Sequence, residues 1–158
     1  MKRTLLTLIL IFTAVLNVGC TKKSPEVTLV TTGLIFNLET KVQNTDFKYN
    51  VEIDEKGDFT ATVLLPENIK GYIIKTENGK FLGEFKGLST ETEGGIIKTL
   101  YDCFNTAKTA EIAEENGEYK ISGKTEFSFD LYLGQTGLPL KLETDSGDIF
   151  YFKNITLK

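Results

Sequence analysis

Apolar and polar residues alternate along most of the chain beyond residue 27. The clearest runs are 47–53, 59–65 and 127–133, where every second residue is apolar. A period of two gives a segment one apolar face, so each run is predicted to be a half-buried β-strand. Weaker alternations predict about six further strands. These lie at 34–38, 72–74, 81–85, 119–121, 138–142 and 150–157.

Short polar turns separate these segments. They are Asp54–Gly57, Glu77–Gly79, Glu115–Gly117 and Asp145–Gly147. A glycine after Asn or Lys supplies the positive φ angle that a tight hairpin requires. Segments that are neighbours in the sequence are therefore expected to pair as antiparallel strands.

One segment has the period of a helix instead. Its apolar residues fall on one stripe, and polar residues such as Lys98 and Asp102 lie opposite. The stripe consists of Ile96, Ile97, Leu100, Tyr101, Cys103 and Phe104. A helix is therefore predicted over about residues 93–107.

The predicted sheet is too large for this helix to cover. Three to four helical turns are about 20 Å long, whereas about nine strands extend much further. This predicts a mainly β fold, a single strongly curved antiparallel sheet (a half-barrel) with the helix across its concave side. A two-sheet sandwich is the alternative. The alternation does not show whether the concave side keeps an apolar cavity or is filled by side chains.

The first twenty residues have a different pattern. Lys2 and Arg3 precede a largely apolar run over residues 5–16, which is too short to span a bilayer. A small residue, Gly19, then precedes Cys20. These features are typical of a secretory signal peptide.

The end of this segment resembles a bacterial lipoprotein signal, although Asn17 stands where a leucine is usual. The resemblance implies that Cys20 carries acyl chains such as palmitate and becomes the new N-terminus, on the extracytoplasmic face of the cell membrane. Simple secretion, with Cys20 as a small residue near the cut, is the alternative. The chain then divides into a signal peptide (1–19), a lipidated cysteine with a short tether (20–26) and one β domain (27–158).

Charge and tether length limit the partners of such a domain. The chain has 18 basic and 22 acidic residues, and Lys2 and Arg3 leave with the signal, so the mature chain carries a net charge of −6. This charge makes nucleic acid an unfavourable partner. Two acyl chains suffice for stable membrane anchoring. Residues 21–26 reach about 20 Å when extended, so the domain is expected to lie close to the bilayer.

The composition argues against an enzyme. The chain contains no histidine, which removes the commonest general base and the commonest metal ligand. No catalytic residue, metal or cofactor is therefore predicted. Two acidic clusters, at residues 54–58 and 145–148, lie in predicted hairpin turns, where acidic residues are ordinary. Calcium binding by Asp54 and Asp58 is an alternative. Cys103 is predicted to be a buried, unreactive thiol.

Three turn segments carry a further resemblance. They are 65–74, 85–88 and 134–139. Together with the curved sheet and the lipid anchor, they resemble the LolA-like half-barrel lipoproteins, which include small Gram-positive members and the spore-germination lipoproteins. The resemblance implies an unclosed barrel whose concave face holds acyl chains or a hydrophobic element of a partner. The long N-terminal helix of the periplasmic carriers has no counterpart here, which puts shuttling between membranes in doubt.

We therefore expect a membrane-anchored, non-enzymatic lipoprotein whose concave apolar face binds a lipid or an acyl chain. The expected cradle consists of Phe59, Val63, Tyr72, Phe81, Phe127, Phe129 and Leu131, with Leu100 and Phe104 of the helix as its lid. The alternative is an envelope scaffold with a filled core, which docks another exported protein through its rim or an edge strand.

Overall fold

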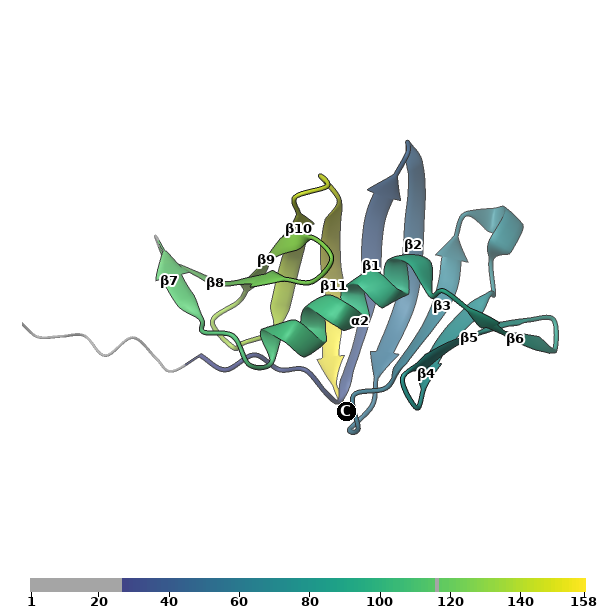
Figure 1. Ribbon diagram of the computed structural model, residues 1–158, viewed down its shortest axis with the longest axis horizontal. Coiled ribbons are helices and arrows are strands. Elements are labelled where there is room, and N and C mark those ends of the chain that lie inside the picture. The colour runs from purple at the N-terminus through teal and green to yellow at the C-terminus, as the bar shows by residue number, and fades with distance from the viewer. Residues whose placement is uncertain (1–26, 116) are drawn as a thin grey trace, which may run out of the picture.

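The computed structural model describes residues 27–158 except Asn116. The predictions for the signal peptide, Cys20 and the tether lie outside these residues. Eleven strands form one antiparallel sheet, accompanied by a 3-10 helix, η1 (Glu67–Ile69), and helix α2 (Gly95–Ala107) (Figure 1). The strands are β1 (Leu34–Val42), β2 (Thr45–Ile53), β3 (Phe59–Leu65), β4 (Ile73–Glu77), β5 (Lys80–Phe85), β6 (Leu88–Thr92), β7 (Ala113–Glu115), β8 (Glu118–Lys124), β9 (Ser128–Leu133), β10 (Pro139–Thr144) and β11 (Ile149–Leu157).

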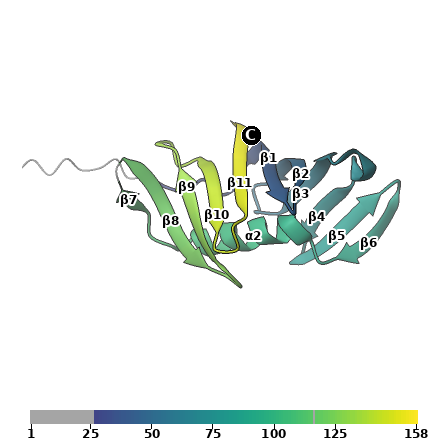
Figure 2. The ribbon, with the colours of Figure 1, turned by 90° about the horizontal axis from the view of Figure 1, so that it is seen from above.

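The sheet is built from two meanders. Its strand order is β6-β5-β4-β3-β2-β1-β11-β10-β9-β8-β7, so strands β1 to β6 form one meander and β7 to β11 the other. The two join where β1 pairs with β11, with Leu34 opposite Leu157. Seen from above, the sheet is open and curves around α2, which lies on its concave side (Figure 2). This arrangement confirms the predicted half-barrel with one helix.

Helix α2 begins at the second of two consecutive glycines. Gly94 (φ 79°) and Gly95 (φ 50°) both lie in the left-handed region of backbone conformation, which favours glycine. A Cβ atom on Gly94 would come within 2.6 Å of the Phe81 ring. The glycine pair therefore lets the chain turn from β6 into a helix that lies close to β5. The observed bounds of α2 confirm the predicted helix.

Strands β6 and β7 are additional to the predicted ones. Neither has an alternating pattern, and nearly all of their residues are exposed. They form through backbone pairing with β5 and β8, respectively, which does not depend on an apolar face. Hydrophobic periodicity therefore gave no signal for them.

Two predicted inward-facing leucines face outward. A register shift next to Lys48 places Leu65 opposite that residue, and Leu65 is 38% exposed. A second shift, before Lys141, leaves Leu140 51% exposed. An extra residue in one strand changes the face to which the neighbouring side chains point. The inward positions predicted for Leu65 and Leu140 are therefore wrong.

A single apolar core lies between the concave face of the sheet and α2. The helix contributes Ile97, Leu100, Cys103, Phe104 and Ala107, all buried. The centroid of the Phe104 ring lies 6.0 Å from that of Phe59 and 5.8 Å from that of Phe152, which is the spacing of favourable aromatic pairs. Throughout the described residues, every buried side-chain nitrogen or oxygen has a hydrogen-bond partner. No helix among them has the length and apolar character needed to cross a membrane.

Candidate functional site

The structure gathers the nine predicted cradle and lid residues on the concave side of the sheet and on α2. The buried ones are Phe59, Val63, Phe81, Leu100, Phe104, Phe129 and Leu131. Phe127 is half-buried, as is Tyr72, whose ring lies over Gly83 of β5. The side chains of Leu100 and Leu131 have no exposed surface, and Phe104 is 1% exposed. The concave face is therefore filled by α2, and these residues form its packing surface.

The concave face reaches solvent beside the first turns of α2. A groove of about 610 Å³ there exposes parts of Phe81 and Phe127. Its other side chains are largely charged and pair with one another, since Lys98 Nζ lies 2.6 Å from an oxygen of Asp102 and 3.7 Å from one of Glu126. This rim of the core is therefore polar.

The convex face of the sheet carries a row of charged and tyrosine side chains. From β8 to β3, register neighbours across seven strands are Lys120, Tyr132, Lys141, Tyr151, Glu39, Lys48 and Leu65. Successive side chains of a strand point to opposite faces, and the neighbours of these residues along their strands are largely the buried core residues. The row therefore crosses the outer face, opposite α2.

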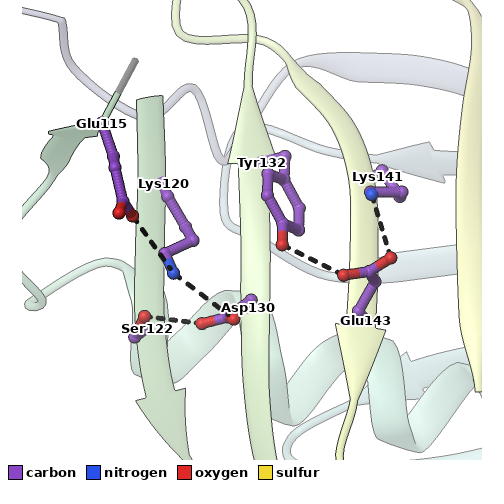
Figure 3. A network of polar contacts seen from close by, with 7 residues as sticks. All are labelled: Glu115, Lys120, Ser122, Asp130, Tyr132, Lys141 and Glu143. Carbon is purple, nitrogen blue, oxygen red and sulfur yellow. Dashed lines mark hydrogen bonds and ion pairs between the residues drawn. The ribbon is translucent and has the colours of Figure 1, made fainter. Parts of the chain in front are cut away.

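One end of this row is a network of polar contacts (Figure 3). Lys141 Nζ lies 2.9 Å from Glu143 and 4.2 Å from the centroid of the Tyr132 ring, while the Tyr132 hydroxyl donates to Glu143. The hydrogen bond from Lys141 lowers the pKa of Glu143, and the bond to Glu143 raises the pKa of Tyr132. Each shift favours the charge state that the group ordinarily has near neutral pH. The network therefore holds fixed charges and does not prepare a group for proton transfer.

At the centre of the row, Glu39 forms ion pairs with two lysines. Its carboxylate contacts Lys48 Nζ at 2.9 Å and also forms an ion pair with Lys153. The hydrogen bond from Lys153, followed by that from Lys48, lowers the pKa of Glu39. Two lysines, on the two strands that flank β1, are thus held by one carboxylate.

A groove of about 770 Å³ lies at one end of β1, β2 and β11, and we call it the outer groove. Its apolar residues are Phe47, Leu65, Ile149 and Tyr151. Its charged residues are Glu39, Lys41, Asp46 and Lys48. Leu65, Ile149 and Tyr151 are 38%, 36% and 46% exposed, and are three of the seven large hydrophobic residues exposed in the described chain. Exposed apolar side chains therefore line this groove, whose volume is typical of ligand sites.

Sequence reasoning missed the outer groove for a definite reason. The groove depends on Leu65, whose outward position follows from the register shift next to Lys48. It also depends on the contact between β1 and β11, where the Thr40 hydroxyl donates to the carbonyl of Ile149 at 2.8 Å. Tyrosines at alternate positions on the outer face, such as Tyr151, were the one available signal.

Asp54 organises a turn. Its carboxylate accepts hydrogen bonds from the backbone N–H groups of Lys56 at 2.8 Å and Asp58 at 3.0 Å. The bond from Asp58 is the main cause of the lowered pKa of Asp54. Such bonds are the usual role of Asp in turns. Across the described residues, no three or more Cys, Asp or Glu side chains gather as a group that could hold a metal ion.

Comparison of sequences gives no relative for this chain. No protein-family model matches it, and no curated protein matches it in sequence. Similarity to known proteins is therefore found only by comparing the fold with solved structures.

Several solved structures are similar in shape. An uncharacterized conserved protein from Thermus thermophilus aligns with a TM-score of 0.54 and 10% identity, over 82% of this chain and 80% of that one. A LolA superfamily protein from Nitrosomonas europaea gives a TM-score of 0.47 and 11% identity, over 87% of this chain and 91% of that one. MucB in complex with MucA(peri) gives 0.35 and 13%, over 80% of this chain and 50% of that one. The first likeness concerns the fold alone, and the other two have TM-scores too low to carry an argument.

Proposed function

We propose that the chain is a non-enzymatic lipoprotein, held on the extracytoplasmic face of the cell membrane by acyl chains on Cys20, that docks another exported protein through its outer surface. The observation that carries this proposal is the filled concave face. Leu100 and Leu131 are 0% exposed, and Phe104 is 1% exposed. With the interior occupied by α2, the outer surface remains as the place for a partner.

The energetics of the core support this choice. Lifting α2 would expose side chains such as Ile97, Leu100 and Phe104, each at about 1.5–3 kcal/mol. A ligand of the concave face would have to offset that loss, whereas a partner of the outer face requires no rearrangement. Docking at the surface is therefore the simpler function for this structure.

The available side chains support a non-enzymatic role. The sequence has no histidine, and burial raises the pKa of the Cys103 thiol to about 12. A thiol in that state is a weak nucleophile. The shifted carboxyl groups, Glu39, Asp54 and Glu143, are all lowered in pKa, which is the direction that disfavours a general acid.

An acyl-chain cradle is the second candidate. One observation favours it: a single helix covers the apolar face, and it joins β6 through two glycines with positive φ, Gly94 and Gly95. If α2 moved away, an acyl chain in its place would meet Phe59, Phe129 and Leu131. The resemblance to LolA-like lipoproteins implies the same use of the concave face, and the short predicted tether keeps that face near a membrane.

Hydrogen exchange of α2 separates the two candidates. The intact mature lipoprotein, in nanodiscs, would be exposed to deuterated water with and without palmitic acid, and exchange of peptides covering Gly95–Ala107 would be followed by mass spectrometry. For the docking function we expect the same protection of α2 in both samples. Faster exchange of α2 with palmitic acid, with β1 and β11 unchanged, would establish the cradle instead.

Photo-crosslinking in living cells tests the docking function directly. The full-length lipoprotein would carry p-benzoylphenylalanine in turn at Asn50, Thr62, Leu88, Glu114 and Tyr151, which sample the outer face and both edge strands. We expect an adduct with one exported protein from at least one of these positions. If irradiation yields no protein adduct at any of them, the docking function is wrong.

A further inference from the structure

Strand β6 is an open edge of the sheet. It pairs with β5 on one side, has no neighbour on the other among the described strands, and lies at one end of the sheet in both overall views (Figures 1 and 2). Natural proteins protect such edges with bulges, prolines, very short strands or charges. Strand β6 has a register without a bulge, no proline and one charged residue, Glu91. Its edge is therefore suited to pairing with another strand.

The register shows which backbone groups of β6 face outward. Residues 86–87 form a two-residue turn with positive φ at both positions, which closes with a hydrogen bond from the N–H of Leu88 to β5. Because the backbone groups alternate in direction along a strand, the N–H and C=O groups of Ser89 and Glu91 point away from β5. The carbonyl of Glu91 accepts a long bond, 3.4 Å, from the Thr90 hydroxyl, and its second lone pair can accept another. Such a row of donors and acceptors matches an extended polypeptide.

We propose that two copies of this protein associate through β6, as an antiparallel pair with a two-fold axis at Thr90. Ser89 of each copy then lies opposite Glu91 of the other, and each of these pairs exchanges two backbone hydrogen bonds. Thr90 faces its own counterpart, which is a favourable cross-strand pair. This register satisfies the outward-facing backbone groups of both strands.

The same register brings an exposed leucine to a groove. Leu88 is 78% exposed, and the two-fold pairing places it opposite Thr92 of the second copy. Thr92 is opposite the buried Phe81 of β5, so these side chains lie on the concave side of the sheet. They lie beside the groove of about 610 Å³ that exposes parts of Phe81 and Phe127. Each Leu88 would therefore cover apolar surface that a single copy leaves in water.

Charges at the two ends of β6 are complementary. Lys86 lies in the turn before the strand and Glu93 follows the strand; both are exposed, and neither forms an ion pair within the described residues. Antiparallel pairing brings the start of one β6 beside the end of the other, so Lys86 of each copy approaches Glu93 of the other. Glu91 is paired with Lys80 of its own copy at 3.2 Å and lies opposite Ser89. Charge therefore favours a second copy in this orientation.

The other edge of the sheet is unsuited to the same pairing. Strand β7 has three residues, two of which are glutamates. A two-fold pair centred on Glu114 would set this carboxylate opposite its own counterpart, and like charges directly opposite each other are destabilising. A dimer through β6 has only β7 strands as its edges, so association closes at two copies. Pairing of β6 in any other register leaves part of the edge open.

Sedimentation equilibrium of the intact mature lipoprotein in a density-matched detergent measures this association. One five-residue edge gives a small interface, so we expect a monomer–dimer equilibrium with a Kd on the order of 10 μM. Ser89→Pro removes an outward N–H without removing a bond to β5, and should weaken dimerisation about tenfold or more. Ser89→Ala keeps that N–H and is the matched control, with an unchanged Kd. Equal thermal midpoints of the two variants would show that the fold is intact.

Disulfide trapping tests the register. Two Thr90 residues on the axis would have Cα atoms about 4.5 Å apart, which is within the range of a disulfide. Thr90→Cys should therefore form a disulfide-linked dimer when it is treated with oxidised glutathione. Leu88→Cys alone should not, but it should link to Thr92→Cys when the two variants are mixed. Cys103 is buried and should take no part.

A charge exchange tests the orientation without changing the strand. Lys86→Glu should weaken dimerisation about fivefold or more. Adding Glu93→Lys to the same chain should restore the original Kd, because opposite charges again meet across the axis.

Three results would overturn the proposal. The first is a protein that stays monomeric at concentrations about tenfold above the expected Kd. The second is a dimer that Ser89→Pro and Lys86→Glu leave unchanged. The third is a disulfide that forms as readily in Leu88→Cys alone as in Thr90→Cys. The docking function is tested separately, by photo-crosslinking to another exported protein.

Discussion

Single glycines decide where distant backbone segments can meet. A Cβ atom on Gly137 would lie 1.8 Å from the carbonyl oxygen of Thr28, and Gly137 has φ of 78°. Backbone, unlike the end of a flexible side chain, cannot move aside at little cost. The absence of a side chain at Gly137 therefore allows the backbone of the N-terminal segment to pack against the turn between β9 and β10.

Gly137→Ala should consequently be more damaging than an alanine at another left-handed glycine. We expect it to lower the free energy of unfolding by about 2 kcal/mol or more, because left-handed strain and a backbone clash add together. Gly79→Ala is the control, since Gly79 has φ of 76° with nothing within 4 Å of its Cβ position, and should cost about 1 kcal/mol. Urea unfolding measures both, and equal losses would contradict the clash.

The buried rings contribute through packing. The Phe129 side chain lies on the concave side of the sheet and is 3% exposed. Phe129→Ala should therefore lower the free energy of unfolding by about 3–5 kcal/mol. Leu88→Ala provides the contrast, because Leu88 is 78% exposed and should change stability by less than about 0.5 kcal/mol. A loss below about 1 kcal/mol for Phe129→Ala, measured by chemical denaturation, would be incompatible with its burial.

The lowered pKa of Glu39 makes a specific prediction about acid. Hydrogen bonds from Lys153 and then Lys48 hold its pKa below the ordinary value of 4.5, so the folded state favours the carboxylate. That stabilisation is complete above the unfolded pKa and is lost as pH falls through the folded pKa. Glu39→Gln should therefore destabilise the protein at pH 7, and its difference from wild type should shrink below pH 4.5. Thermal midpoints across pH measure this, with Glu114→Gln as a control that makes no ion pair among the described residues.

Sequence pattern predicted the residues of the core better than those of the outer groove. The concave residues repeat every second position, so burial of Phe59 and Phe129 follows from periodicity. Leu65 and Leu140 belong to the same kind of repeat but lie next to register shifts. A shift of one residue depends on the pairing partner, which one strand's own sequence does not specify.

Among the elements, those with a strong internal period were predictable. Helix α2 and the strands with apolar alternation were predicted close to their observed positions. Strands β6 and β7 are held by pairing with β5 and β8 alone, so their own sequences contain little sign of them. They are also the two edges of the sheet.

Strand β6 is the edge most open to unwanted pairing. It has five residues, and Leu88 is 78% exposed. Leu88→Lys should slow aggregation at high concentration, because a charge on an edge strand opposes edge-to-edge association, while the unfolding free energy stays within about 0.5 kcal/mol of wild type. Light scattering during incubation measures the first effect. Aggregation at the wild-type rate would mean that β6 is not the associating edge.

At the scale of the whole molecule, the fold is completed by the pairing of β1 with β11, two strands that lie far apart in the sequence. Turn chemistry predicted that neighbours in sequence pair, and the two meanders follow from it. The pairing of β1 with β11 joins residues more than a hundred positions apart, such as Ile35 and Thr156. No local pattern specifies that union, although it completes the sheet and one side of the outer groove.

The membrane anchor is a prediction for the whole chain. Cells expressing the full-length protein and grown with labelled palmitate should incorporate label into it, because an acylated Cys20 carries the chains. Cys20→Ala should remove the label and release the protein from the membrane fraction, while Cys103→Ala should retain it. Label that persists in Cys20→Ala would show that acylation at this cysteine is wrong.

If the chain is exported as we propose, the central position of β11 affects when the domain can fold. This strand follows all the others in the sequence, yet it pairs with both β1 and β10 and contributes Phe150 and Phe152 to the core. A polypeptide that leaves a translocation channel N-terminus first delivers β11 after every other strand. Until then β1 can pair only with β2 and β10 only with β9, and the core lacks Phe150 and Phe152. For a chain exported in this way, we therefore expect the complete domain to form only after β11 has left the channel.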